Sequence, residues 1–171
     1  MVRRTTGTMI LTLSAGLALA GIAYRFGKVG HREKEPDVSP NSSSGLVNVP
    51  SGHSVAETAQ RLEASLKQKG IQVFARIDHA AGAKDVGMDL RPTLLLIFGN
   101  AKAGTPLMQS KQTVAIDLPL KALIWEDADG KVWLTYNRPD YVAERHGIAD
   151  RTEAVKTLSV GLEALAKTAT E

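Results

Sequence analysis

Residues 120–137 read LKALIWEDADGKVWLTYN, and this stretch has the pattern of two strands joined by a turn. Apolar and β-branched residues fill most of the two flanks, 120–126 and 131–136. The connecting residues 127–130 contain two aspartates and a glycine. Tight turns favour these types because aspartate hydrogen-bonds its own backbone and glycine adopts a positive φ. The stretch therefore predicts a β-hairpin.

Three more strands and a helix are expected before the hairpin. Residues 46–49 and 71–79 are predicted strands, and 93–98 (TLLLIF) is apolar on both faces, which predicts a central strand covered on both sides. Ser54 and Glu57 have the spacing of a capping box at a helix start. One apolar stripe follows at helical spacing: Val55, Ala59, Leu62 and Leu66.

Two helices are expected after the hairpin, and a short one before it. Thr105 and Pro106 suit the first positions of a short inserted helix, and 139–146 is a second short helix. The last helix begins near Asp150 and carries an apolar stripe at Val155, Leu158, Leu162 and Leu165. The order β-α-β4-α predicts an α+β fold, an antiparallel sheet of about five strands with helices packed on one face.

The first 45 residues differ from the rest in composition. Arg3 and Arg4 precede an uncharged, mostly apolar run at 8–24, so residues 1–24 are expected to be a signal peptide cleaved after Ala20 or an uncleaved transmembrane anchor. Residues 25–45 are rich in serine, proline and charge, which indicates a flexible linker. The single domain at 46–171 is thus expected to be exported, either periplasmic or held at the membrane outside the cytoplasm.

Charge and cysteine content exclude several classes of function. The formal net charge is +3, but six of the 21 lysines and arginines lie in the first 34 residues, together with one of the 18 acids. The predicted domain is therefore mildly acidic, which argues against a nucleic-acid partner. The absence of cysteine excludes disulfides, thiolate metal sites and cysteine nucleophiles.

Three uncommon strings follow one another in the second half: FGNAKAGTPLMQ at 98–109, AIDLPLKALIWEDADGKVWLTYNRP at 115–139 and DYVAERHGI at 140–148. In these strings the chain resembles the bacterial and archaeal family of domains of unknown function numbered 302. The resemblance implies a helix-grip or TATA-binding-protein-like α+β fold and a homodimer. Folds of that kind can hold a ligand between the curved sheet and the terminal helix.

Two histidines are candidate ligands. His79 is expected at the inward phase of its strand, where it either ligates a metal or pins a turn by a hydrogen bond. His146 is expected at a helix end, where it either caps carbonyl groups or meets His79. With Met108 the two histidines would suit copper or haem. No local spacing such as HxH supports that site.

Two tryptophans and two aspartates mark the hairpin. Trp125 and Trp133 would form a dimer contact, line a pocket or pack as a cross-strand pair. Asp127 and Asp129 resemble the start of a calcium loop, but the bidentate glutamate of an EF-hand is missing, which favours a turn.

No catalytic motif stands out: the chain lacks GxSxG, a P-loop and GxGxxG. We therefore expect an exported or envelope-tethered binding or accessory module without catalytic activity. Its partner would be a small apolar ligand or an envelope protein, and the sequence names no cofactor. Two alternatives stay open, a metal- or haem-binding protein using His79 and His146, and an enzyme of unrecognised type.

Overall fold

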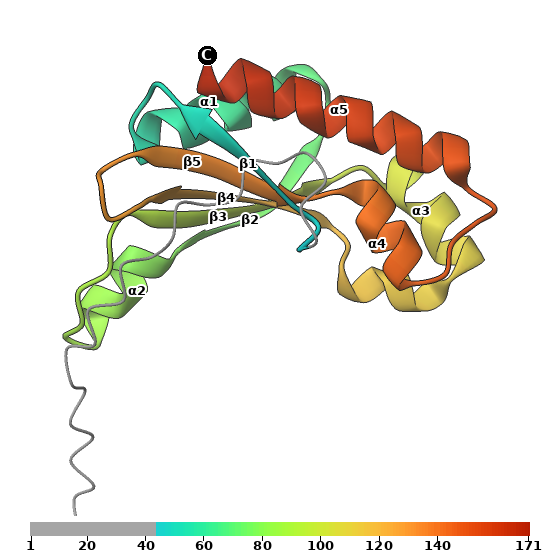
Figure 1. Ribbon diagram of the computed structural model, residues 1–171, viewed down its shortest axis with the longest axis horizontal. Helices are drawn as coiled ribbons and strands as arrows, with labels where there is room; N and C mark the ends of the chain where they lie inside the picture. Colours follow the sequence, from blue (N-terminus) through green and yellow to red (C-terminus); the bar gives the residue numbers. More distant parts are fainter. Residues whose placement is uncertain (1–43) are drawn as a thin grey trace, which may run out of the picture. The chain divides into compact units, whose positions relative to one another are not determined.

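The computed structural model describes residues 44–171 of the chain. The elements in chain order are β1 (Leu46–Ser51), α1 (Val55–Gln68), β2 (Gln72–Asp78), α2 (His79–Asp85), β3 (Thr93–Gly99), α3 (Ala101–Ser110), the 3₁₀-helix η1 (Gln112–Ile116), β4 (Leu120–Glu126), β5 (Val132–Asn137), α4 (Pro139–Arg145) and α5 (Thr152–Thr170). The five strands form one antiparallel sheet in the order β1-β5-β4-β3-β2 (Figure 1). The predicted α+β class and five-stranded sheet are confirmed.

The predicted hairpin is the β4–β5 pair. Trp125 and Trp133 lie directly opposite each other, and Gly130 in the turn has a φ of 79°. Asp127 holds the turn together because its Oδ1 accepts hydrogen bonds from the backbone N–H groups of Asp129 (3.0 Å) and Lys131 (2.9 Å). The aspartate and the glycine therefore have the roles that their residue types suggest.

The main core lies between one face of the sheet and helices α1 and α5, which lie side by side (Figure 1). Ser54 caps α1, since its Oγ accepts from the backbone N–H of Glu57 at 3.2 Å. The predicted stripe of α1 is buried, and it meets buried side chains of α5 and of the central strands: Leu94, Leu96, Phe98, Ala122, Ile124, Leu134, Leu162 and Leu165. Burying each large apolar side chain contributes about 1.5–3 kcal/mol.

The other face of the sheet is not covered by a helix within residues 44–171 (Figure 1). Along β3, Leu94, Leu96 and Phe98 are buried, whereas Leu95 and Ile97 on the opposite face are half-buried. Within the described part of the chain, β3 is thus fully buried on one face and half-buried on the other. The alternation is that of a strand with one face in the core.

Strand β2 departs from the regular alternation that the sequence suggests. Val73 pairs with Phe98 and Ala75 with Ile97, so Phe74 is an extra residue in a β-bulge. After the bulge the faces are exchanged, and Ala75 and Ile77 lie on the face away from α1. The expected inward strand position of His79 is wrong, because the strand ends at Asp78 and residue 79 begins α2.

A smaller apolar cluster lies beyond one end of the sheet. It joins α3, η1, α4 and the start of α5 through buried side chains: Leu107, Val114, Val142, Ala143, Ile148 and Val155. In Figure 1 these short helices occupy one end of the sheet and α2 projects from the other. The inserted helix is longer than the sequence indicates, because it begins at Ala101 with Asn100 as its N-cap and carries Pro106 inside it.

The transmembrane prediction requires a correction. No helix among residues 44–171 is both long enough and apolar enough to cross a bilayer. The stretch that suggested an anchor, 8–24, lies outside the described residues, as do the cleavage position after Ala20 and the linker up to residue 43. A membrane-spanning helix therefore has no counterpart in the described structure.

Candidate functional site

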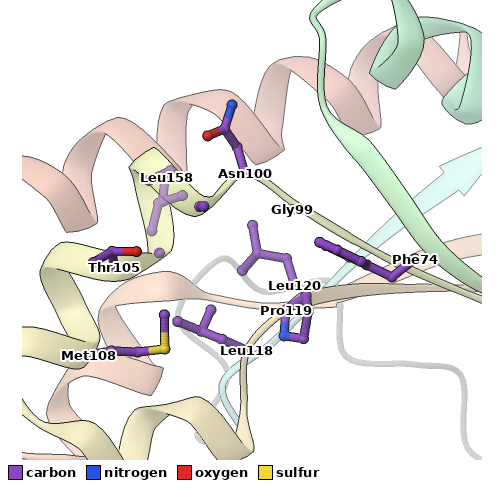
Figure 2. Close-up of a pocket in the computed structure, with 12 residues that line it drawn as sticks. Phe74, Gly99, Asn100, Thr105, Met108, Leu118, Pro119, Leu120 and Leu158 are labelled. Atoms are coloured by element: carbon purple, nitrogen blue, oxygen red, sulfur yellow. The ribbon is translucent and has the colours of Figure 1, made fainter.

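A cavity of about 270 Å³ lies between α3, the adjoining ends of β3 and β4, and α5 (Figure 2). We call it the α3 pocket. Its lining residues are Phe74, Gly99, Asn100, Ala101, Ala103, Gly104, Thr105, Met108, Leu118, Pro119, Leu120 and Leu158. Seven of these residues belong to the string FGNAKAGTPLMQ, so the most distinctive stretch of the sequence builds the cavity.

Small residues at the start of α3 create the space. Asn100 begins the helix, because its Oδ1 accepts from the backbone N–H of Lys102 at 2.8 Å. The pocket side of the first turns then carries Ala101, Ala103 and Gly104. A Cβ atom on Gly104 would lie 3.6 Å from Leu118 Cδ1 and 3.9 Å from Met108 Cε, which is ordinary van der Waals contact. Position 104 therefore leaves room that a larger side chain would fill.

The remaining wall comes from three separate parts of the chain. Phe74 stands in the β2 bulge and is 52% exposed, which places its ring at the mouth of the pocket. A Cβ on Gly99 would lie 3.5 Å from Pro119 Cβ and 3.6 Å from Phe74 Cε2, so these two side chains approach the glycine closely. Leu158 completes the wall from α5.

The chemistry of the α3 pocket is almost purely apolar. None of the lining residues within 44–171 carries a charge, and Asn100 and Thr105 bring the polar side chains. In Figure 2 the hydroxyl oxygen of Thr105 points toward the side chains that line the cavity, whereas the amide of Asn100 points away from them. The arrangement suits a neutral apolar guest and offers no paired acid and base for catalysis.

A polar cluster lies beside the pocket wall, and we call it the His146 clamp (Thr113, Asp117, Arg145 and His146). His146 Nε2 lies 2.7 Å from Asp117 Oδ2, and its Nδ1 lies 3.2 Å from Thr113 Oγ1. Arg145 Nη1 approaches Asp117 Oδ1 at 3.3 Å. The clamp ties the end of α4 to η1 and to the residue that precedes Leu118 of the pocket wall.

The candidate histidines are not brought together. His79 is an exposed residue at the start of α2, whereas His146 follows α4, and these helices lie at opposite ends of the sheet (Figure 1). Met108 lines the α3 pocket. Residues 44–171 contain no group of three or more His, Cys, Asp or Glu side chains arranged to hold a metal ion. Binding of a metal or haem stays a prediction, without a shared site for these two histidines.

The tryptophans form a cross-strand pair on the sheet face away from α1 and α5, outside the α3 pocket. Trp133 is 2% exposed and donates its Nε1–H to Asp127 Oδ2 at 2.7 Å, while Lys131 Nζ lies 4.1 Å from the centre of its ring. The hydrogen bond from Trp133 is the largest cause that lowers the pKa of the Asp127 carboxyl. The backbone N–H groups of the turn lower it further.

Trp125 belongs to a second hydrogen-bonded row on the same face. Its Nε1–H donates to Thr135 Oγ1 at 2.9 Å, and the Thr135 hydroxyl donates to Asn48 Oδ1 at 2.6 Å. This row links β4, β5 and β1. In the described structure the two indoles therefore hydrogen-bond within the hairpin, and Trp125 is linked to β1 through Thr135.

A wider groove of about 760 Å³ runs between β1 and α5, where the family resemblance implies a ligand space. Burial, and secondarily the charge of Glu163, raise the pKa of the Tyr136 phenol at this groove. Charged side chains of both signs line it, among them Lys156 and Lys167 beside Glu163. The α3 pocket, by contrast, has no charged side chain among its described lining residues.

Sequence reasoning missed most of the α3 pocket. Of its residues only Met108 was a candidate, and Phe74, Gly104, Leu118 and Leu158 were not. The available signal was Gly104 within the helical stretch, because a glycine inside a helix lowers its stability and leaves no side chain to fill space.

A family model and a solved structure match this chain over most of the described domain. The model of the family described as "Domain of unknown function DUF302" matches residues 47–165. A solved structure described as an uncharacterized conserved protein DUF302 from Bacillus stearothermophilus aligns with a TM-score of 0.67 at 21% identity. The alignment covers 73% of this chain and 98% of that one. At this identity the likeness shows the fold alone.

Two curated relatives carry a functional name. "Fluoride-specific ion channel FluC 1" of Brucella suis biovar 1 (strain 1330) is 45% identical over 150 residues, which is 87% of this chain and 59% of that protein. "Fluoride-specific ion channel FluC 1" of Brucella abortus biovar 1 (strain 9-941) is also 45% identical over 150 residues, at 56% of its length. The chain thus spans less than two thirds of either relative.

Proposed function

Since this chain belongs to the DUF302 family, whose description assigns no activity, we propose from its geometry that residues 46–171 form a binding module for a small apolar ligand. The ligand occupies the α3 pocket, and the module performs no chemistry on it. One observation carries the proposal: a cavity of about 270 Å³ with an uncharged and almost entirely apolar lining.

The size and lining of the pocket support this function physically. Ligand sites are typically concave and mostly apolar, with few polar groups that fix orientation. An apolar cavity of roughly 150 Å³ is large enough to bind benzene. The α3 pocket exceeds that volume, so a larger apolar body fits, and its binding removes the apolar surface of Leu118, Leu120 and Leu158 from water.

Occupation of the pocket is tested by filling it. The full chain is titrated with N-phenyl-1-naphthylamine, a neutral probe that fluoresces in apolar surroundings, and compared with Gly104→Leu. The leucine side chain occupies the cavity, so we expect the affinity to fall at least about tenfold. Gly161→Leu is the matched control, because no heavy atom lies within 4 Å of a Cβ at position 161. Equal binding by both variants would refute the pocket as the site.

A natural ligand is sought by native mass spectrometry. The full chain, purified gently from its own host, is expected to retain a small molecule that Gly104→Leu lacks. A mass equal to that of the bare polypeptide in both proteins, together with failure of the probe titration, would exclude the proposed function.

We also propose that the module acts outside the cytoplasm. The basic residues Arg3 and Arg4 before the apolar run at 8–24 support export. Sequencing the N-terminus of the protein recovered from its host is expected to give Gly21 as the first residue. Finding the protein in the cytoplasmic fraction alone, with Met1 intact, would contradict export.

A second candidate is an accessory role beside a fluoride channel. The 45% identity to two proteins named fluoride-specific ion channels favours it, because in those proteins the matching part belongs to the same polypeptide as the remaining two fifths. Deletion of the gene is expected to lower the fluoride concentration at which growth stops. Complementation by the wild type but not by Gly104→Leu would tie that role to the pocket, and unchanged fluoride tolerance would exclude it.

The homodimer implied by the family resemblance is a further proposal. The half-buried side chains Leu95, Ile97 and Leu123 on the sheet face away from α1 and α5 support it, since partly exposed apolar side chains gain from contact with a second copy. Sedimentation of the wild type and of Leu123→Lys tests it, and a monomeric wild type would exclude it.

A further inference from the structure

Thr105 differs from several helical hydroxyls of the domain, which bond within their own helix. In α5 the hydroxyl groups of Thr157, Ser159 and Thr168 each donate to the carbonyl four residues earlier, at 2.8–3.0 Å. In α1 the hydroxyl of Thr58 does the same, at 2.9 Å. Such local bonds are the usual use of a hydroxyl within a helix.

The hydroxyl of Thr105 has no hydrogen-bond partner in the part of the chain that the structure describes, although the residue lies within α3. Its oxygen points toward the cavity (Figure 2). A hydroxyl offers one donor and two acceptor positions. Because Thr105 is an exposed residue, its hydroxyl lies at the rim of the apolar wall, where a guest can replace water as its hydrogen-bond partner.

The charges around the pocket restrict that guest. No described lining residue is charged, so an ionic group inside the cavity would lose its hydration without gaining a counter-ion from them. The ligand body in contact with Leu118, Leu120 and Leu158 must therefore be neutral. A single hydroxyl or carbonyl group on that body, placed beside Thr105, recovers the hydrogen bond that it loses with water.

The volume sets the size. A cavity of roughly 150 Å³ holds one benzene ring, and the α3 pocket measures about 270 Å³. A body of two fused six-membered rings, or an aliphatic body of similar bulk, is the corresponding guest. A single ring would leave part of the wall without contacts, and that loss weakens binding.

We propose that the α3 pocket selects a neutral, two-ring-sized apolar molecule with one hydroxyl or carbonyl group, which hydrogen-bonds to Thr105 Oγ1. This inference rests on the proposed binding function. It adds that Thr105 binds the polar end of the ligand. Thr105 is then the residue that makes an oxygenated ligand bind more tightly than the bare hydrocarbon.

The test uses two probes that differ by one hydroxyl, naphthalene and 2-naphthol, with the full chain and Thr105→Val. The wild type is expected to bind 2-naphthol about fivefold more tightly than naphthalene, the factor that one net hydrogen bond supplies. Thr105→Val keeps the shape of the side chain and removes its hydroxyl. It is expected to abolish the preference while naphthalene binding stays within about twofold, and Thr105→Ser is expected to retain it.

Thr157→Val is the matched control, because that hydroxyl is bonded within α5 and lies outside the pocket lining. The outcomes separate the two proposals. If neither probe binds the wild type, the binding function itself fails. If naphthalene binds but 2-naphthol has no advantage, or the advantage survives Thr105→Val, the role of Thr105 is refuted and the apolar site stands.

Discussion

The side chains of His146 and Asp117 meet at 2.7 Å between Nε2 and Oδ2, with 9% and 15% of their surfaces exposed. A carboxylate only accepts hydrogen bonds, so Nε2–H is the donor and Nδ1 is left for the hydroxyl of Thr113. Because Asp117 directly precedes Leu118, this bond fixes the backbone where the wall of the α3 pocket begins.

The His146 clamp predicts unequal effects of two histidine substitutions. His146→Ala leaves the largely buried Asp117 without its closest partner, so we expect the free energy of unfolding to fall by about 1–3 kcal/mol. His79→Ala is the control, because an exposed side chain away from any buried network changes stability by about 0.5 kcal/mol or less. Urea unfolding measures both, and equal midpoints would show that the clamp contributes nothing.

Two glycine-to-alanine substitutions separate stability from binding. Gly104→Ala in α3 and Gly161→Ala in α5 each gain helix propensity, up to about 1 kcal/mol relative to glycine. Neither added methyl meets an atom closer than 3.6 Å. Both variants are expected to melt at higher temperature, but only Gly104→Ala reduces the pocket volume and weakens naphthalene binding. Weaker binding in Gly161→Ala as well would contradict this assignment.

Asp127 predicts a pH dependence of stability. The Trp133 hydrogen bond and the turn amides lower its pKa in the folded state, whereas the unfolded chain has the ordinary value of 3.8. The carboxylate therefore stabilises the fold above pH 3.8, and this contribution is lost as the pH falls through the folded-state pKa. Asp127→Asn is expected to be less stable than the wild type at pH 7, with a difference that shrinks toward pH 3. A difference independent of pH in thermal unfolding would contradict the prediction.

Gly45 and Gly130 test the start of the folded domain. Both have a positive φ, 71° and 79°, so alanine costs about 1–2 kcal/mol at either position. At Gly130 nothing lies within 4 Å of an added Cβ, whereas at Gly45 that atom would lie 2.2 Å from Cγ of Tyr141. Gly45→Ala is therefore expected to lose at least about 1–3 kcal/mol more than Gly130→Ala in urea unfolding. Equal losses would mean that residue 45 belongs to the linker.

The local features of the fold were predictable because each depends on a few neighbouring residues. The turn at 127–130 follows from aspartate and glycine, and the start of α1 follows from Ser54 and Glu57. The bulge at Phe74 has no comparable local signal. The bulge reverses the two faces of β2 after Val73, and the strand ends at Asp78, so the inward placement predicted for His79 was wrong.

The α3 pocket was hard to predict for a different reason. It exists because Ala103 and Gly104 of α3 carry little or no side chain. Other parts of its wall, Leu118 and Leu158, are distant from them in the chain. Periodicity identifies side chains that fill a core, and it does not identify an unfilled volume between elements. The partner of His146 was missed similarly, because Asp117 lies 29 residues away in sequence.

Phe74 is the one residue of β2 without a counterpart in β3, since Val73 pairs with Phe98 and Ala75 with Ile97. Its exchange for another residue removes no cross-strand neighbour, yet it alters the mouth of the pocket. A substitution at position 74 is therefore expected to change which probes enter the α3 pocket without changing the pairing of β2 with β3.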